Sequence, residues 1–511
     1  SDKGRTDAIN KILKELNLNP KGEFYLWVAK DSKSFYQNYV KPNKNVTVDL
    51  PAKLLVKAGE IVKNDFKQID FGNSYQSNLV TVEVPNVKPE KHALDRTGKK
   101  VLDGKEVQLG DYIQYFLNGI TVPEKHDTLY QYDGLDKLDT KHDRYTGNWK
   151  GIIKGTEYTA EKELVLPYDV TLKNGKVIKA GDKIAKGSTY AFTFEFNQGT
   201  NSEFIKKLVT VKWDAKGGQW SYVINQDFLN SLGVKGTFDA DFYIEVERIE
   251  TGDKIENTFI NIVNKQEMTA KVITRTPEPP KPKHPEKHAL DKTGQKVLDG
   301  KEVQMGELIQ YLLDGATVPE RHHTLYQYDG LDKLDMKHDR YTGNWKGVIK
   351  GTEYTAEKDL TLPYDVILKD GKVIKAGDKI AKGSTYAFTF EFNQGTNSEF
   401  IKKLVTIKWN EKTGVWSYVI NQDFLNSLGV KGTFDADFYI EVERIAAGEV
   451  ENTFVNIVNG QEMIAKVTTR TPEPPKPEPK EPGKPQPQPS LPNTGTAASM
   501  LPVVGMILGL L

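Results

Sequence analysis

The chain has 511 residues, of which 38% are hydrophobic, and it carries 70 basic and 70 acidic side chains. This length has room for three or four domains, and the absence of net charge gives no electrostatic reason to expect nucleic acid or an anionic membrane as a partner. There is no cysteine, which excludes disulfides as a source of stability. Residues 1–11 are charged and lack the apolar core of a signal peptide, so we expect the sequence to be a piece of a longer protein.

The first segment, residues 1–88, is predicted to be the C-terminal part of a first β-sandwich domain. Residues 7–17, DAINKILKELN, are predicted to form a helix, and residues 23–30, EFYLWVAK, a strand. The segment ends with NDFKQIDFGNSYQSNLVTVEVP, which is similar to the ENTFINIVNKQEMTAKVITRTP that ends a later domain. Both endings precede the same Lys-His-Ala-Leu-Asp motif, so we expect the segment to be related to that later domain.

The rest of the chain contains an internal duplication. KHALDRTGKKVLDGKEVQLGDYIQY, beginning at Lys91, recurs as KHALDKTGQKVLDGKEVQMGELIQY from Lys287, and both copies continue to RTPEPPKP. A period of about 196 residues is far too long for a solenoid unit. It predicts two complete homologous domains, at residues 89–275 and 287–470. The Pro-dense residues 276–286 between them are predicted to be a semi-rigid linker.

Each repeat is rich in segments with the two-residue alternation of strands. The first copy shows it in TYAFTFEF, FIKKLVTVKW and FDADFYIEVERI, at residues 189–196, 204–213 and 238–249. Glycine-containing turn signals separate these segments. The helical patterns in the repeat are short. An example is NQDFLNSLG, which Asn225 could cap and Gly233 could end. The predicted fold class is therefore mainly β, with tandem Ig-like β-sandwich domains joined by Pro-rich linkers.

The C-terminal part is predicted to be a stalk and an anchor. Residues 471–490 are rich in Pro, Lys, Glu and Gln, and an extended chain of this length reaches roughly 60 Å. The apolar residues 496–511 are too few to span a bilayer. Between them, Leu491, Pro492, Asn493, Thr494 and Gly495 match the LPxTG sorting signal of Gram-positive surface proteins. In those proteins a sortase cleaves between Thr and Gly and joins the Thr carboxyl to peptidoglycan; the basic tail that normally comes next is missing, consistent with truncation at Leu511.

The repeats, stalk and sorting signal together resemble the C-terminal region of the streptococcal antigen I/II adhesins, and the resemblance covers nearly the whole chain. It implies β-sandwiches closed by spontaneous Lys–Asn isopeptide bonds, and a non-enzymatic, secreted and wall-anchored adhesin. The implied partners are host glycoproteins of the salivary or extracellular-matrix type or other bacteria, together with sortase and peptidoglycan, with no nucleic acid and a monomeric chain. The alternatives are the stalk of a wall-anchored enzyme and a pilin-like subunit, although the YPKN-like lysine motif of pilins is absent.

The isopeptide reaction that the resemblance implies needs a neutral lysine amine, an asparagine carboxamide and a buried acid. The lysine candidates are Lys91 and, in the second repeat, Lys287. Three asparagines are available near the end of each repeat, in what we predict to be its last strand. We favour Asn257 because it shares a face with the core aromatic Phe259. Its counterpart is Asn452, with Asn261 and Asn456 as alternatives; Asn264 and Asn459 are expected in turns.

The assisting acid is expected in LYQYDGLDKLD. Family pattern and strand position favour Asp133 and Asp329, with Asp136 and Asp332 as alternatives. The stretch YDGLDKLDTKHDR could also supply oxygen ligands for calcium, but it lacks EF-hand spacing, so no cofactor is required. His126, His142, His322 and His338 have no zinc-binding spacing, and we predict no metal site.

Overall fold

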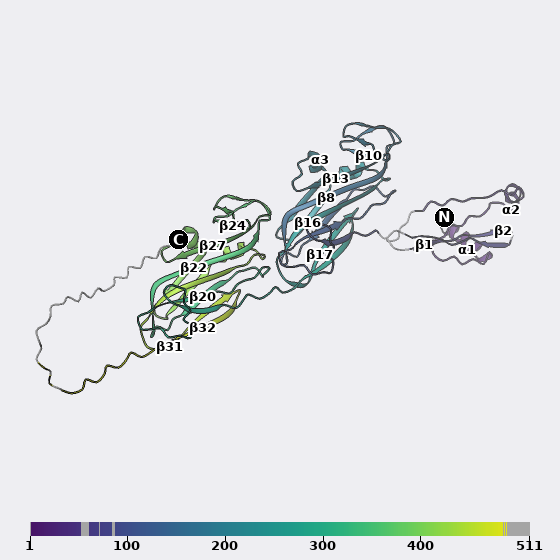
Figure 1. Cartoon of the computed structure of the whole chain (residues 1–511). Helices are drawn as coiled ribbons and strands as arrows, with labels where there is room; N and C mark the ends of the chain where they lie inside the picture. Colours follow the sequence, from purple (N-terminus) through teal and green to yellow (C-terminus); the bar gives the residue numbers. More distant parts are fainter. Residues whose placement is uncertain are drawn as a thin grey trace. The chain divides into compact units, whose positions relative to one another are not determined.

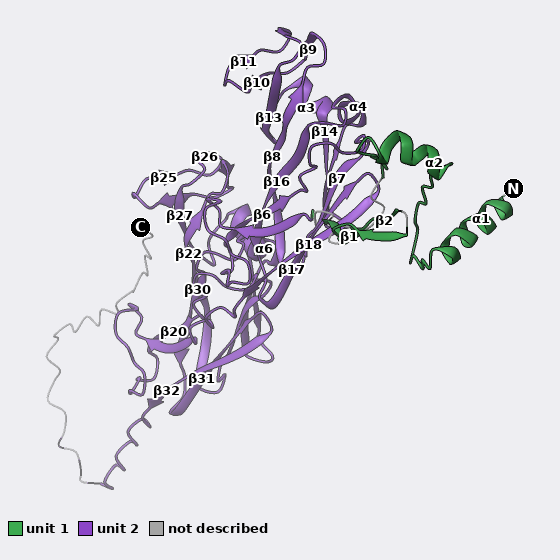
Figure 2. Ribbon diagram, turned by 90° about the vertical axis from the view of Figure 1, so that its right-hand side faces the viewer, with its two compact units in different colours: residues 1–87 green, residues 88–511 purple. Residues whose placement is uncertain are grey.

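The computed structural model describes residues 2–52, 61–70, 72–83, 87–483, 485 and 487. The chain divides into two units, residues 1–87 and residues 88–511, which Figure 2 shows in green and purple. The second unit contains both repeats. The predicted sorting signal and apolar tail lie outside the described residues. In the part of the chain that is described, no helix combines the length and apolarity needed to cross a bilayer.

The first unit consists of short elements. Its helices are α1 (Asp2–Glu15), α2 (Ser32–Phe35) and the π-helix η1 (Tyr36–Val40), and its strand pairs are β1 (Ile61–Asn64) with β4 (Val80–Glu83) and β2 (Lys67–Asp70) with β3 (Asn73–Gln76). The predicted helix is present and begins earlier than expected. The strand predicted at residues 23–30 is wrong. A strand needs a neighbour for its backbone hydrogen bonds, and among the described residues none pairs with this segment.

The first repeat folds into two main sheets (Figure 1). The seven-stranded sheet has the order β11-β10-β13-β8-β16-β6-β5, and the five-stranded sheet the order β14-β15-β7-β17-β18. The strands are β5 (Glu90–Leu94), β6 (Tyr112–Asn118), β7 (Tyr132–Lys137), β8 (Asp143–Thr159), β10 (Val170–Leu172), β11 (Val177–Ile178), β13 (Thr189–Asn197), β14 (Val209–Asp214), β15 (Gln219–Ile224), β16 (Thr237–Arg248), β17 (Gly252–Val263) and β18 (Gln266–Thr276). A small pair, β9 (Leu164–Val165) and β12 (Lys183–Ile184), and two helices, α3 (Glu203–Leu208) and α4 (Gln226–Ser231), complete it.

The second repeat reproduces this topology, with sheets β19-β20-β30-β22-β27-β24-β25 and β28-β29-β21-β31-β32 and the pair β23-β26. Its elements are β19 (Glu286–Leu290), β20 (Leu308–Asp314), β21 (Tyr328–Lys333), β22 (Asp339–Thr355), β23 (Leu360–Thr361), β24 (Val366–Leu368), β25 (Val373–Ile374), β26 (Lys379–Ile380), β27 (Thr385–Asn393), α5 (Glu399–Leu404), β28 (Val405–Asn410), β29 (Val415–Ile420), α6 (Gln422–Ser427), β30 (Asp435–Arg444), β31 (Gly448–Val458) and β32 (Gln461–Thr471). In both copies the first strand lies at one edge of the larger sheet and the last strand at one edge of the smaller.

The hydrophobic core of each repeat lies between its two sheets. Alternate residues of β16 are buried, from Phe238 to Val246, as expected for a strand with one face on the core. The ring centroids of Tyr222 on β15 and Phe242 on β16 are 4.0 Å apart, so aromatic side chains of the two sheets stack directly. This arrangement confirms the predicted mainly β, β-sandwich class.

Several predicted elements of the first repeat can be compared with the structure. Two of the predicted strands correspond to β13 and β16, and the predicted short helix is α4, whose first turn is capped by the Asn225 side chain. The strand predicted at residues 204–213 is only half correct. Its first part is α3, capped by Ser202, whose hydroxyl accepts a hydrogen bond from the backbone N–H of Ile205. A local cap therefore overrides the strand pattern.

Candidate functional site

Three strands bring a lysine, an aspartate and an asparagine together between the two sheets of the first repeat. Lys91 lies on β5 at the edge of the larger sheet, and this edge adjoins β18 of the smaller sheet. Asp136 lies on β7, directly opposite Phe259 of β17. Because strand side chains alternate, Asn257 shares a face with Phe259 and is a diagonal neighbour of Asp136.

The lysine and the aspartate form a buried ion pair. Lys91 Nζ donates a hydrogen bond to Asp136 Oδ1, and both side chains are 0% exposed. In the second repeat Lys287 and Asp332 make the same contact at 2.7 Å. The lysine nitrogen also lies 4.8 Å from a tyrosine ring centroid in each copy, that of Tyr115 or Tyr311. Each lysine amine is therefore shielded from water and held against one carboxyl group.

Burial moves both members of this pair toward their neutral forms. Desolvation lowers the pKa of Lys91, against the opposing charges of Asp136 and Asp143. Desolvation likewise raises the pKa of Asp136, against the opposing charge and hydrogen bond of Lys91. The same directions hold for Lys287 and Asp332. A low-dielectric site of this kind favours a neutral amine beside a protonated acid.

Asn257 presents its amide to this pair. Its Nδ2 donates to the backbone oxygen of Lys137 at 3.2 Å. Among the described residues, Asn257 Oδ1 and Asp136 Oδ2 are both buried without a hydrogen-bond partner, and Asn452 and Asp332 repeat this pattern. Leaving a buried acceptor unpaired costs about 1–3 kcal/mol. A proton on the aspartate would let it donate to the amide oxygen and satisfy both atoms.

The structure does not bring the favoured acids, Asp133 and Asp329, to the lysines. On β7 the buried face carries Tyr132, Gly134 and Asp136, so Asp133 points to the other face. Asp133 is half-buried and accepts a hydrogen bond from Gln131 Nε2 at 2.9 Å, and Asp329 is held by Gln327 in the same way. The structure therefore places the alternatives, Asp136 and Asp332, beside the lysines, and Asp133 and Asp329 away from them.

The alternative asparagines have a different environment. Asn261 is also buried, but its Oδ1 accepts from the backbone N–H of Ile120 and its Nδ2 donates to the backbone oxygen of Asp133, both at 2.9 Å. Asn456 makes the corresponding two contacts. Asn261 and Asn456 thus join backbone segments, and neither has a free carbonyl oxygen.

We expected the favoured asparagines on the last strand of each repeat, but they do not lie there. Asn264 and Asn459 have positive φ values, both 47°, and turn the chain from β17 into β18 and from β31 into β32. This confirms that these two residues are in turns. Asn257 and Asn452 consequently lie on the strand before the last.

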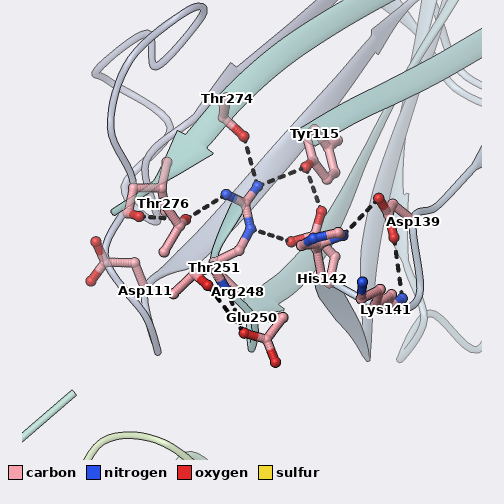
Figure 3. Close-up of polar contacts among 12 residues, drawn as sticks. Asp111, Tyr115, Asp139, Lys141, His142, Arg248, Glu250, Thr251, Thr274 and Thr276 are labelled. Atoms are coloured by element: carbon pink, nitrogen blue, oxygen red, sulfur yellow. Dashed lines mark hydrogen bonds and ion pairs between the residues drawn. The ribbon is translucent and has the colours of Figure 1, made fainter. Parts of the chain in front are cut away.

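Next to the lysine lies a second buried polar cluster that the sequence did not reveal (Figure 3). Arg248, fully buried at the end of β16, donates to Asp143 Oδ1 at 2.7 Å and to the hydroxyls of Thr274 and Thr276 at 2.6 and 2.7 Å. Tyr115 donates to the other oxygen of Asp143 at 2.6 Å. The cluster joins β16 and β8 of the larger sheet to β18 of the smaller one, and Arg444 builds the same cluster in the second repeat. A charged residue after an alternating apolar run was the only sequence signal.

The acidic stretch suggested for calcium presents its carboxylates to separate partners. Asp136 faces Lys91, Asp139 faces His142 at 2.8 Å, and Asp143 faces Arg248. A calcium site there stays a prediction. Within the described ranges, the only three-residue group whose ligand atoms converge is Glu286, His288 and Asp314. Repeat one has Asn118 in place of Asp314, and we assign no ion to this group.

The chain matches two described sequence families. "Cell surface antigen C-terminus" matches residues 88–277 and 284–472, one match to each repeat. "Cell surface antigen I/II C2 terminal domain" matches residues 2–84. Together the two matches cover most of the chain.

The chain is also similar to individual proteins. The chain is 27% identical over 259 residues to the aggregation substance of Enterococcus faecalis, a match that covers 49% of this chain and 17% of that protein. The chain thus spans about a sixth of that relative's length. Among solved structures, the C-terminal domain of the antigen I/II polypeptide BspA from Streptococcus agalactiae is 20% identical, covers 75% of this chain and 100% of its own, and gives a TM-score of 0.26. The C-terminal domain of AspA from Streptococcus pyogenes is 20% identical. That match covers 75% of this chain and 99% of the AspA domain, with a TM-score of 0.27.

Proposed function

The chain belongs to the antigen I/II type of cell-surface antigens, as part of their C-terminal region, and from this premise we propose that it is the self-cross-linked stalk of a wall-anchored adhesin. The observation that carries the proposal is the buried set of Lys91, Asp136 and Asn257, repeated as Lys287, Asp332 and Asn452. Disulfides cannot strengthen a stalk without cysteine, so the cross-links would be its covalent source of mechanical strength.

The proposed reaction joins Lys91 to Asn257. The Lys91 ammonium first gives a proton to Asp136, which leaves a neutral amine and a protonated acid. Asp136 then donates to Asn257 Oδ1, which makes the amide carbon more electrophilic, and the amine attacks that carbon. The bond between Nζ and the amide carbon forms and the bond to Nδ2 breaks. Nδ2 leaves as ammonium, with one proton from Nζ and the proton that Asp136 held. Asp136 ends in its starting state, so one acid serves the whole reaction.

The cross-link would connect the two sheets of each sandwich. It closes the loop between residues 91 and 257, and the chain-entropy treatment of cross-links gives on the order of 5 kcal/mol for a loop of this size. Asp136 and its partners already hold the reacting groups in place, so little entropy is lost on reaction. We infer that the bond forms as the domain folds and that it stabilises the stalk against both unfolding and proteolysis.

The remaining parts of the proposal concern location and adhesion. Thr494 of LPNTG would be joined to peptidoglycan by sortase, and the Pro-rich residues 471–490 would cross the wall. The stalk would then present the adhesive part of the whole protein to host glycoproteins or to other bacteria. No enzymatic activity is proposed beyond formation of the cross-links. Family membership supports this assignment, and the buried triads support its mechanical part.

The intact mass of the purified chain tests the cross-links. We expect the mass to fall short of the sequence mass by two molecules of ammonia, one for each repeat. Peptide mapping should recover branched peptides that contain Lys91 with Asn257 and Lys287 with Asn452. A mass equal to the sequence mass would contradict the proposal, and branching at Asn261 or Asn456 would contradict the choice of asparagine.

A further inference from the structure

Side chains of repeat two contact repeat one directly. Arg321 Nη1 of repeat two donates to the backbone oxygen of Leu109 and to Asp111 Oδ1, both at 2.7 Å. The ring nitrogens of His323 lie 3.0 Å from Glu250 Oε1 and 2.8 Å from Glu278 Oε2. We call this set of contacts, together with those around the ring of Tyr112, the joint.

The Tyr112 half of the joint combines cations, a carboxylate and the aromatic ring. Arg96 Cζ lies 4.0 Å and Lys431 Nζ 4.2 Å from the ring centroid, as expected for cation–π contacts. Glu357 accepts hydrogen bonds from both cations, at 2.7 and 2.8 Å. Gly110 makes room for this packing, because a Cβ there would lie 2.4 Å from Lys431 Cγ.

Burial distinguishes the joint from the equivalent surface of repeat one. The side chains of Lys431 and Glu357 are 25% and 26% exposed. Their counterparts Lys235 and Glu161 form the same ion pair but are 65% and 68% exposed. Exposed pairs of this kind contribute little, so the partial burial and the shared network give the joint its strength.

The two repeats are nearly copies, yet they differ at the positions that build the joint. On its repeat-one side, Arg96, Asp111, Tyr112 and Glu250 stand where repeat two has Lys292, Glu307, Leu308 and Ala446. On its repeat-two side, Arg321 and His323 stand where repeat one has Lys125 and Asp127. Glu250 adds a second carboxylate for the imidazole beside Glu278, and Tyr112 adds an aromatic face for the lysine. Arg321 and His323 are the side chains on the other side that use this surface.

We propose that these differences encode a docked joint, which fixes the orientation of repeat two on repeat one and makes the two domains a single stiff segment. The same differences would stop the docking from propagating. A head-to-tail contact between homologous domains can extend without limit if each end fits the next copy. Leu308 and Ala446 remove the ring and the carboxylate from the corresponding end of repeat two, so a second chain would find no equivalent site there. This inference does not depend on the proposed isopeptide bonds.

Spin-label distance measurements on the full chain test the joint. The chain has no cysteine, so Thr193→Cys and Thr389→Cys place one label on each repeat, at exposed and equivalent positions of β13 and β27. We expect a single narrow distance distribution at low ionic strength. Raising the salt should broaden it, because the Debye length falls from about 8 Å at 0.15 M to about 3 Å at 1 M.

Exchanging residues between the repeats gives matched variants whose side chains the fold already accommodates. Arg321→Lys with His323→Asp, and separately Tyr112→Leu with Glu250→Ala, should broaden the distribution severalfold at low salt. The reverse exchange in repeat one, Lys125→Arg with Asp127→His, should leave it narrow. A broad distribution in the labelled chain without these exchanges would overturn the proposal, as would a distribution that the first two exchanges leave unchanged.

Discussion

The Lys287 nitrogen lies 2.7 Å from Asp332 Oδ1, and the side chains of both residues are 0% exposed. A buried ion pair contributes little net stability, because the loss of hydration offsets most of the attraction. The pair occurs in both repeats, each time beside an asparagine whose carbonyl oxygen has no hydrogen-bond partner among the described residues. This arrangement favours a role in a reaction over a role in packing. Single substitutions can separate the roles of the residues that surround the pair.

Asp136→Ala should abolish the cross-link in repeat one, because no other group on the buried face of β7 can take the lysine proton. The mass deficit should fall from two ammonia molecules to one, and the remaining branched peptide should come from repeat two. Asp133→Ala is the matched control and should keep both. Loss of the repeat-one cross-link in the Asp133 variant would contradict the assignment of the acid.

Asn257→Ala and Asn261→Ala should separate reaction from structure. The first should remove one ammonia from the mass deficit. The second should keep both cross-links but leave the N–H of Ile120 and the backbone oxygen of Asp133 without their partners, at a cost of about 1–3 kcal/mol. Mass spectrometry would measure the ammonia deficit. Urea unfolding would measure the stability cost of Asn261→Ala, by comparing Asn257→Ala chains with and without it.

Arg248→Met should destabilise repeat one by about 3–5 kcal/mol, because it leaves the buried carboxylate of Asp143 without its cation. Asp143→Leu in the same chain should recover part of this loss, since it removes the unpaired charge. Urea unfolding followed by hydrogen exchange can assign the loss to repeat one, with repeat two as an internal reference. Equal stability of the single and double variants would show that Asp143 does not depend on Arg248 for its charge.

His92 should titrate above the usual histidine value of about 6.5. Partial burial acts against its protonation, but hydrogen bonds with Asp103 and Glu90 outweigh this effect and raise the pKa of His92. Protonated His92 therefore stabilises the fold. That contribution is complete below about pH 6.5 and is lost as the pH rises through the raised pKa.

Nuclear magnetic resonance of the imidazole carbons would measure this titration directly. Asp103→Asn should lower the midpoint, because it replaces a carboxylate 2.6 Å from His92 Nδ1 with a neutral amide. A midpoint at or below the usual value in the unmodified chain would contradict the prediction.

Sequence patterns sufficed for the architecture and for part of the site. The duplication and the alternation in β13 and β16 predicted tandem β-sandwiches, and the Asn264 turn was recognisable from its second copy, where Gly460 follows Asn459. Asn257 could be placed on the buried side of its strand from the sequence, because it shares a face with Phe259. These are local regularities, which the backbone geometry of strands and turns determines directly.

Other features depend on partners that are distant in sequence. In YDGLDK both Tyr132 and Leu135 are apolar, so the pattern alone could not show whether Asp133 or Asp136 faces the core; packing of the neighbouring sheet decides it. Arg248 looks like an ordinary charged end of a strand until β18 supplies its two threonines. The apolar alternation of EFYLWVAK likewise needs a neighbouring strand that its sequence cannot specify.

The position of Asn257 one strand before the end of its domain has a consequence for a stalk under tension. A bond from Lys91 to Asn257 would leave β18 outside the cross-linked loop, held by its pairing with β17, by Arg248 and by backbone hydrogen bonds of Ile273 and Arg275 with residues 104–107. Pulling β18 away from β17 would release the segment between residues 263 and 276, about 44 Å when fully extended at roughly 3.4 Å per residue, while the rest of β17 stays paired with β7. Each repeat would then yield by a fixed length before its covalent bond bore the load, and would recover that length when β18 paired again. Arg248, which holds Thr274 and Thr276, would be one of the contacts that set the force at which this reversible extension begins.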